Sequence, residues 1–248
     1  MNDNFLKLND EKTEFIIFGT PHDVKRVTEW TVSVGQEEIL PSTTVRNIGA
    51  MLDSALTMES HINNVRKSCY MQIRILSKIR NYLSEEAAKS LTHAFVTSRL
   101  DNMNSLLHNP PNCQTEKLQL IQNHAARVVK KCKRSDHITQ TLIDLHWLPV
   151  KFRLQYKLLI LVYKSLHGNG PAYLSSLLEE YHPSRNLRST AQARLSEPFV
   201  HKRYGERAFS VAGPKLWNAL PENLRKSNSL DVFKKSLKTH FFKVAYDL

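Results

Sequence analysis

The stretch TMESHINNVRKSCYMQIRILSKIRNYLS, residues 57–84, carries the amphipathic pattern on which the fold prediction depends. Its apolar residues recur in steps of three, four or seven, which predicts a helix with one buried face. They are Met58, Ile62, Val65, Cys69, Ile73, Leu76 and Leu83. Thr57 is placed to cap the start of this helix. Lys67, Arg74 and Lys78 lie roughly 140 to 180 degrees from Cys69, so we expect them to form one row on the solvent face.

A second helical pattern begins directly after this stretch. Ser84 is a suitable N-cap, and Glu85 and Glu86 suit a first helical turn, where negative charge is favoured. Ala87, Leu91, Ala94, Phe95 and Ser98 form the expected inner stripe of this helix. The dipeptide Pro110-Pro111 then ends the helical pattern.

The composition indicates a folded, mainly helical chain that has a basic surface. Among 248 residues 41% are hydrophobic, which is enough for a core, and only 7 are glycine. The formal charge of +12 and the pI near 9.6 favour a polyanionic partner, most often nucleic acid and less often an anionic membrane surface. The alternative is a solvated, lysine-rich surface without such a partner.

The positive charge belongs to the helical part of the chain. Residues 1–56 hold 5 Lys and Arg against 9 Asp and Glu, whereas residues 57–248 hold 30 against 14. The net charges are therefore −4 and +16. We expect a polyanion to meet the second part rather than the first.

Cysteine usage and hydropathy predict the compartment. Cys69, Cys113 and Cys132 are odd in number, and no Cys and His set has zinc-site spacing. The longest apolar run, residues 158–163, is far shorter than the roughly 18 residues of a membrane span. We therefore expect an intracellular protein, nuclear or cytoplasmic, without a membrane partner.

Residues 1–56 are predicted to be rich in β-strands. The short apolar run at 15–18 and the alternation through Trp30, Val32 and Val34 are typical of strands, and Gly35-Gln36 indicates a turn. Residues 39–40 and 45–52 are expected to pair back onto them. About three short strands are too few to stand alone, so the segment is interpreted as the end of a larger domain.

Further helices are predicted downstream. A third helix through residues 118–132 ends in the basic run KKCKR, residues 130–134, and Asp136 is expected to cap a short helix that reaches residue 145. Pro149 suits the first position of the next helix, which is apolar all round at 158–163 and is closed by Gly168. Residues 171–180 predict a short helix.

The C-terminal part combines a basic segment without periodicity and one more amphipathic helix. Residues 181–213 show no sustained period and are interpreted as an ordered loop or a linker rich in arginine. The last helix is expected to start at Ser229. Leu230, Phe233, Leu237 and Phe241 should face inward, and Lys234, Lys235 and Lys238 outward.

No catalytic or metal-binding constellation is predicted. The chain has no nucleophile elbow, phosphate-binding glycine loop, HExxH helix or CxxC pair. Two-metal phosphoryl transfer needs carboxylates that converge on the metals. The neighbouring acidic pairs, such as Glu37/Glu38 and Glu179/Glu180, are instead typical of solvated turns and helix starts.

Six stretches carry a family resemblance. They are LNDEKTE (8–14), VRNIG (45–49), HINNV (61–65), FVTSRLD (95–101), DLHWLPV (144–150) and GPKLWNALP (213–221). On these stretches the chain resembles the C-terminal portion of reverse transcriptases from non-LTR, LINE-type retrotransposons of the jockey and chicken-repeat kind. They follow the family's order and span almost the whole sequence.

The resemblance implies three regions. Residues 1–56 would be the end of the polymerase palm, 57–135 the thumb and 136–248 the C-terminal helical region. Lys12 matches the lysine after the catalytic strand, and Ile48-Gly49 matches the primer-grip hairpin. The family's metal-binding aspartates lie upstream of these stretches, so magnesium is expected only in the complete parent enzyme. Asn102-Met103 departs from the family's Tyr-Cys at this place.

The chain is therefore expected to be a truncated, catalytically incomplete RNA-directed DNA polymerase that binds RNA or DNA without sequence preference. The predicted contacts to nucleic acid are Lys12, Lys67, Arg74, Lys78, Lys130, Lys131, Arg185, Arg188, Arg194 and Arg203. The missing polymerase portion is a second expected partner. Two alternatives stay open: a helical protein-interaction module, and an inert retrotransposon-derived product without a nucleic-acid role.

Overall fold

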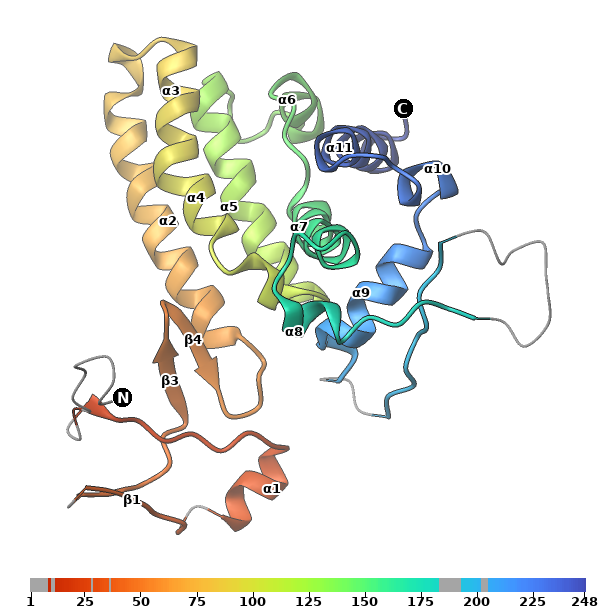
Figure 1. The fold of residues 1–248 in the computed structure, drawn as a ribbon. Coiled ribbons are helices and arrows are strands. Elements are labelled where there is room, and N and C mark those ends of the chain that lie inside the picture. The colour runs from red at the N-terminus through yellow and green to blue at the C-terminus, as the bar shows by residue number, and fades with distance from the viewer. Residues whose placement is uncertain (1–8, 10–11, 28, 36, 183–192, 202–204) are drawn as a thin grey trace. The chain divides into compact units, whose positions relative to one another are not determined.

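The computed structural model describes residues 9, 12–27, 29–35, 37–182, 193–201 and 205–248. The fold is mainly helical with two small two-stranded sheets, as predicted from the sequence (Figure 1). Contacts divide the chain into two compact units, Met1–Val65 (unit 1) and Arg66–Leu248 (unit 2). The expected boundary between residues 135 and 136 lies inside unit 2. The helices before and after it, Asn112–Lys130 (α5) and Val150–Leu166 (α7), pack against each other.

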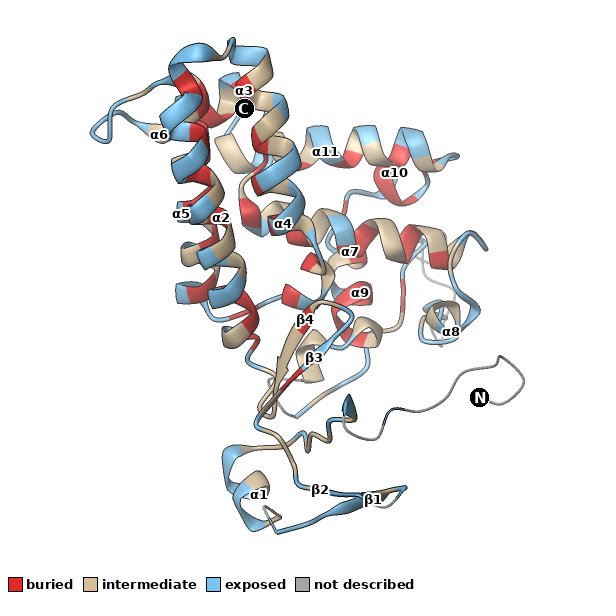
Figure 2. Cartoon of the chain, turned by 90° about the vertical axis from the view of Figure 1, so that its left-hand side faces the viewer, coloured by how far each residue is buried: buried red, intermediate tan, exposed pale blue. Residues whose placement is uncertain are grey.

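Helix α2, Glu59–Ile79, is the amphipathic helix predicted from residues 57–84. Its inner stripe is buried along the length of the helix, and its opposite side is exposed (Figure 2). The buried members are Met58, Ile62, Cys69, Ile73 and Leu76. Local periodicity thus predicted this helix and its buried face correctly.

The start of α2 is capped from a residue that the sequence did not single out. The carboxylate of Asp53 accepts hydrogen bonds from the main-chain N–H of Thr57 at 2.8 Å and of Met58 at 2.7 Å. The Thr57 hydroxyl accepts a longer bond of 3.3 Å from the N–H of Glu59. The predicted cap at Thr57 is therefore only part of the arrangement, and a negative group meets the positive end of the helix.

Unit 1 is built from short elements. They are helix α1, Pro21–Arg26, and strands β1, Val32–Val34, β2, Glu37–Ile39, β3, Thr44–Asn47, and β4, Ala50–Asp53. The strands form two antiparallel hairpins, β1 with β2 and β3 with β4. Ile48 and Gly49 have φ of 46° and 87°, which is the backbone of the tight turn between β3 and β4.

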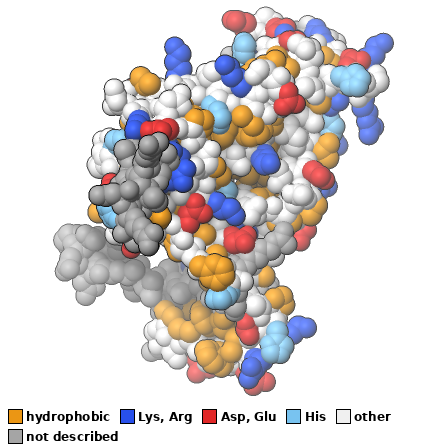
Figure 3. Space-filling view, turned by 90° about the vertical axis from the view of Figure 1, so that its right-hand side faces the viewer, with side chains coloured by type: hydrophobic (Ala, Val, Ile, Leu, Met, Phe, Trp, Pro, Cys, Tyr) orange, Lys and Arg blue, Asp and Glu red, His pale blue; other side chains and the backbone are white. Residues whose placement is uncertain are grey.

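Two expectations for unit 1 were wrong. Residues 15–18 do not form a strand, because the only sheet contact there is an isolated bridge from Phe15 to Pro41. Helix α1 was not predicted, although Thr20 accepts from the N–H of Asp23 and Pro21 occupies its first turn. Large apolar side chains such as Trp30, 63% exposed, stay open to solvent, and Figure 3 shows apolar side chains gathered on one face of this unit.

The first helices of unit 2 follow α2 closely. They are η3, Arg80–Tyr82, α3, Glu85–Thr92, the π-helical η4, His93–Thr97, α4, Ser98–Asp101, and η5, Asn104–Leu107. Ser84 caps α3 as predicted, since its hydroxyl accepts from the N–H of Ala87 at 3.1 Å. The helical pattern ends at Asp101 rather than at Asn109, because Asn102 adopts an extended backbone.

The inner stripe predicted for α3 and η4 was displaced by one residue. Ala88, Thr92, Val96 and Leu100 are buried, whereas Phe95 is 44% exposed. Thr92 can enter the core because its hydroxyl donates to the carbonyl of Ala88 at 2.8 Å. The displacement is already present at Ala88 and Thr92, before the π-helical turn, so that turn is not its cause.

Helix α5, Asn112–Lys130, ends at Lys131 in the left-handed region, close to the predicted end. Helix α6, Ile138–Asp144, begins at His137 without a side-chain cap. The carboxylate of Asp136, the predicted cap, instead accepts from the main-chain N–H of Lys133 at 2.7 Å. The basic run after α5 therefore forms a turn, stabilised by the Asp136 carboxylate, before α6 starts.

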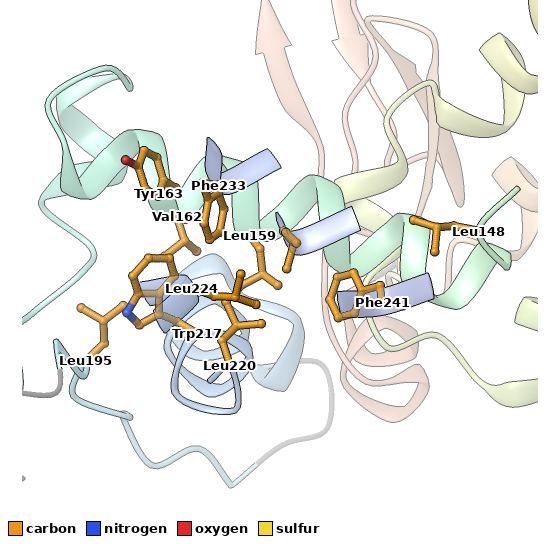
Figure 4. Close-up of a cluster of buried hydrophobic side chains, with 11 residues drawn as sticks. Leu148, Leu159, Val162, Tyr163, Leu195, Trp217, Leu220, Leu224, Phe233 and Phe241 are labelled. Carbon is orange, nitrogen blue, oxygen red and sulfur yellow. The ribbon is translucent and has the colours of Figure 1, made fainter. Parts of the chain in front are cut away.

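Helix α7, Val150–Leu166, is the buried helix that the sequence predicted, and Pro149 lies at its N-cap. Leu159, Val162 and Tyr163 join a cluster of buried side chains from α7, α9, α10 and α11 (Figure 4). Trp217 and Phe233 form its centre, with ring centroids 5.7 Å apart. Gly168 follows the helix with φ of 68°, as expected for a helix C-terminus.

The remaining helices are α8, Ala172–Ser175, η6, Gly205–Arg207, α9, Phe209–Asn218, α10, Glu222–Arg225, and α11, Leu230–Tyr246. Helix α11 starts at Ser229 and buries Phe233, Leu237 and Phe241, as predicted. Helix α9 was missed, because Pro214 lies inside it and residues 209–213 were interpreted as part of the loop.

Candidate nucleic-acid interface

The exposed face of α2 carries the row of cations that the sequence placed there. Lys67, Arg74 and Lys78 are all exposed, and within the described part of the chain none of them forms an ion pair. No Asp or Glu occurs between residues 61 and 83. This row, which is named the α2 basic row below, is therefore a strip of exposed positive charge.

Apolar side chains lie next to this row. Met71 is 56% exposed, Ile75 49% and Ile79 39%, and they follow one another at a spacing of four along α2. At about 100 degrees per residue they occupy the strip adjacent to the α2 basic row. The outer surface of α2 thus offers one strip of cations and one strip of apolar side chains, which is unlike an ordinary solvated helix face.

Arg80 joins the end of α2 to the end of α5. Its guanidinium is buried and donates to the carbonyl oxygens of Val128 at 2.9 Å and of Val129 at 2.6 Å. A cation near these last carbonyls also balances the negative end of the α5 dipole. Arg80 therefore links the C-terminus of α2 to the C-terminus of α5. The exposed residues Lys78 and Lys131 consequently lie at the same end of this helix pair.

Lys130 does not share the exposure of Lys131. Its ammonium group forms an ion pair with the carboxylate of Glu85 at the start of α3. Lys131 is exposed in the left-handed position after α5, and Lys133 and Arg134 follow it on the surface. Lys131 is thus available to bind an anion, whereas Lys130 must first dissociate from Glu85.

The other predicted contacts are not brought to α2 within unit 2. Lys12 is exposed in unit 1, and Arg194 is exposed in an extended segment attached to α9. That attachment is a hydrogen bond from Trp217 Nε1 to the carbonyl of Ala193 at 2.8 Å. Arg185, Arg188 and Arg203 lie outside the described residues.

One contact that the sequence did not reveal joins α2 to α5. The hydroxyl of Tyr70 lies 3.1 Å from Nδ1 of His124 on α5. Burial lowers the pKa of His124, and the charges of Arg127 and Arg134 lower it further. His124 is consequently neutral at pH 7 and adds no charge to the interface.

Among the described residues no three or more His, Cys, Asp or Glu side chains come together in a way that suits a metal ion. In the same part of the chain no helix has the length and apolar character to cross a membrane. Comparisons of the chain with models of protein families, with curated proteins and with solved structures found no match.

Proposed function

We propose that this chain binds nucleic acid without sequence preference through the α2 basic row, as part of a non-LTR retrotransposon reverse transcriptase. The observation that carries the proposal is the exposed, unpaired row of Lys67, Arg74 and Lys78 without an acidic residue from 61 to 83. Three such cations repel one another, so a polyanion that meets them gains free energy and releases its counterions.

The spacing of the row supports a phosphate backbone as the polyanion. Arg74 and Lys78 are one helical turn apart, about 6 Å along α2, and Lys67 precedes Arg74 by about 10 Å. These intervals are similar in size to the spacing of phosphates in a nucleic acid, about 3.4 Å of axial rise for each phosphate of one duplex strand. The proposal requires each cation of the row to contact a phosphate group.

The assignment to a reverse transcriptase rests on the six stretches of sequence likeness and on the mainly helical fold with its small N-terminal hairpins. In this proposal α2 to α5 form the thumb, and α2 lies along the primer-template duplex. An in-frame strand ending in Ala-Asp-Asp, encoded directly upstream of Met1, would support this origin. An unrelated upstream reading frame would contradict it.

Binding is tested by fluorescence anisotropy with an RNA–DNA hybrid, a single-stranded RNA and a DNA duplex of equal length, over a range of KCl concentrations. The variant K67Q/R74Q/K78Q should lower the magnitude of the log K against log salt slope by about 2 to 3, at about 0.7 to 0.9 per phosphate contact. Sequence preference should not change, because phosphate contacts carry no base information.

The matched control is K151Q/K235Q/K243Q, which removes the same charge from exposed positions on α7 and α11. It should leave the salt slope close to that of the wild type. An unchanged slope in the folded α2 variant, or an equal fall in the control, would contradict the proposed interface. Circular dichroism establishes that both variants are folded.

A second function, protein interaction, is favoured by the apolar strip of Met71, Ile75 and Ile79. A partner helix could bury this strip, as amphipathic helices do in apolar grooves. The variant M71Q/I75Q/I79Q separates the two functions. It should leave the salt slope of nucleic-acid binding nearly unchanged, and it should abolish association if a protein partner covers the strip.

A further inference from the structure

An exposed tyrosine lies at the end of the α2 basic row. Tyr82, in η3, is 89% exposed, the largest fraction among the large apolar and aromatic side chains of the described residues. It follows Lys78 by four residues, as Lys78 follows Arg74, so it continues the row by one further turn. The distance along the helix axis is about 6 to 8 Å at the rises of α- and 3₁₀-helices. The row of cations therefore leads to an aromatic side chain.

Tyr82 differs from the tyrosines that take part in the packing of unit 2. The hydroxyl of Tyr163 donates to the carbonyl of Ser227 at 2.9 Å, and that of Tyr246 donates to the carbonyl of Trp147 at 2.6 Å. Within the described part of the chain, the Tyr82 hydroxyl has no such partner, and no aromatic ring packs on the Tyr82 ring. Contacts within the chain therefore give no reason for an aromatic residue at this position.

Hydrogen bonds hold the backbone on both sides of Tyr82. Arg80 donates from Nε to the carbonyl of Val128 at 2.9 Å and from Nη1 to the carbonyl of Leu83 at 2.7 Å. The main-chain N–H of Leu83 donates to the carbonyl of Arg80 at 3.3 Å. A ring on a turn that is already fixed loses little backbone freedom when it contacts a ligand.

Positive charge reaches the same end of the helices from α5. The main-chain N–H of Lys131 donates to the Val128 carbonyl at 3.4 Å, and the same oxygen accepts from Arg80 Nε. The backbone of Lys131 therefore lies beside the Arg80 guanidinium, close to the connection between α2 and α3 (Figure 1). Because the Lys131 side chain is exposed, it adds a second cation to Lys78 near the Tyr82 ring.

Two carboxylates lie near this end of the helices, in the first turn of α3. Glu85 is paired with Lys130. Glu86 meets the N-terminal end of α3, where negative charge is favoured. Lys78 and Lys131 are exposed and have no ion-pair partner among the described residues. A phosphate group at this place can therefore pair with either lysine.

We propose that Tyr82 stacks on an unpaired base of the nucleic acid whose phosphates contact the α2 basic row, so that the chain binds the junction between a duplex and a single strand. This inference rests on the proposed function. Stacking on an aromatic ring tolerates any sequence because every base has a π-face, which suits a row that contacts no base edges. A base inside a duplex is covered by its neighbours, so a single-stranded extension has to supply the free face.

Probes that differ only in the extension separate stacking from phosphate contacts. One probe is a blunt RNA–DNA hybrid, and the other is the same hybrid with a short single-stranded extension, made in both polarities. In fluorescence anisotropy the wild-type chain should bind one extended probe about tenfold more tightly than the blunt probe, as expected for one stacked base. The same extension built from abasic nucleotides keeps the phosphates and should lose this advantage. 2-Aminopurine in the extension should lose fluorescence on binding, because stacking quenches it.

The variant Y82A should raise the dissociation constant of the extended probe about tenfold and leave that of the blunt probe unchanged, whereas Y82F should keep the wild-type preference. The log K against log salt slope should be the same in Y82A as in the wild type, because stacking releases no counterions. The matched control is Y173A, which removes another exposed ring, 68% exposed, from α8. It should leave the binding of both probes unchanged, and circular dichroism establishes that the variants are folded.

Equal affinities of the wild-type chain for the blunt and extended probes, or equal effects of Y82A and Y173A, would overturn the stacking of Tyr82. A preference that Y82A retains would overturn it as well and would leave the exposed ring to a protein partner. An unchanged salt slope in K67Q/R74Q/K78Q contradicts the α2 basic row instead. The stacking and the row of phosphate contacts therefore fail in different measurements.

Discussion

The guanidinium Nη2 of Arg80 lies 2.6 Å from the carbonyl oxygen of Val129, and this bond fastens the end of α2 to the end of α5. The same guanidinium donates from Nη1 to the carbonyl of Leu83 at 2.7 Å. The last carbonyls of a helix lack partners within the helix itself. Arg80, the first residue of η3, is therefore a buried cation that stabilises the fold, unlike the exposed cations of α2.

The variant R80M should destabilise the chain by about 2 to 4 kcal/mol, because it leaves buried carbonyls without a charged donor. Urea unfolding followed by far-UV circular dichroism measures the change. R74M is the control, since Arg74 is exposed on α2 and its loss should change stability by less than about 0.5 kcal/mol. Equal stability of the two variants would mean that Arg80 does not hold α5.

Stability at alkaline pH should depend on Cys69. Burial raises the pKa of this thiol to about 11, from an ordinary value of 9.0, although the charge of Arg99 opposes the shift. The folded state therefore keeps a proton that the unfolded state loses, and stability falls as the pH rises from about 9 to about 11. C69A should flatten this part of the pH profile of urea unfolding relative to the wild type.

Cys113 provides the control for this experiment, because it is exposed. C113A should retain the alkaline loss of stability that C69A removes. In the native protein a thiol reagent should modify Cys113 long before Cys69, as mass spectrometry can record. Rapid modification of Cys69 in the folded chain would contradict its burial.

Unit 1 should open before the core of unit 2. Residues 15–18 belong to no strand, and the main-chain hydrogen bond of this segment that the structure describes is from the Ser42 N–H to the Phe15 carbonyl. Residues 158–163 lie inside α7, where Leu159, Val162 and Tyr163 are at most 2% exposed. Hydrogen exchange should therefore reach residues 15–18 well before residues 158–163. Equal protection of the two segments would show a compensating core in unit 1.

Local sequence patterns determined several elements because helices are formed by neighbours along the chain. The stripe of α2, the apolar α7 and the Ser84 and Ser229 caps were all predicted correctly from spacing and residue type. The exposure of Lys67, Arg74 and Lys78 followed from the same period. Such features need only contacts within a few residues.

Contacts between residues that are far apart in the sequence were revealed only by the tertiary structure. The Arg80–Val129 bond joins positions separated by 49 residues, and the Asp101–Arg153 pair joins positions separated by 52. No periodicity encodes such partners, because packing of whole helices brings them together. The buried stripe of α3 likewise lies one residue away from the predicted one, because α3 packs against α5, which is distant in the sequence.

The sequence by itself thus determined a basic, mainly helical chain with a row of cations on one helix and no acidic residue from 61 to 83. Only the tertiary structure showed that Lys130 is paired with Glu85 while the α2 basic row is unpaired. It alone showed that the indole Nε1 of Trp147 and the amide oxygen of Asn104 are buried without a hydrogen-bond partner among the described residues. The physical reason is that charge and period are local properties, whereas burial and pairing are properties of the packed chain.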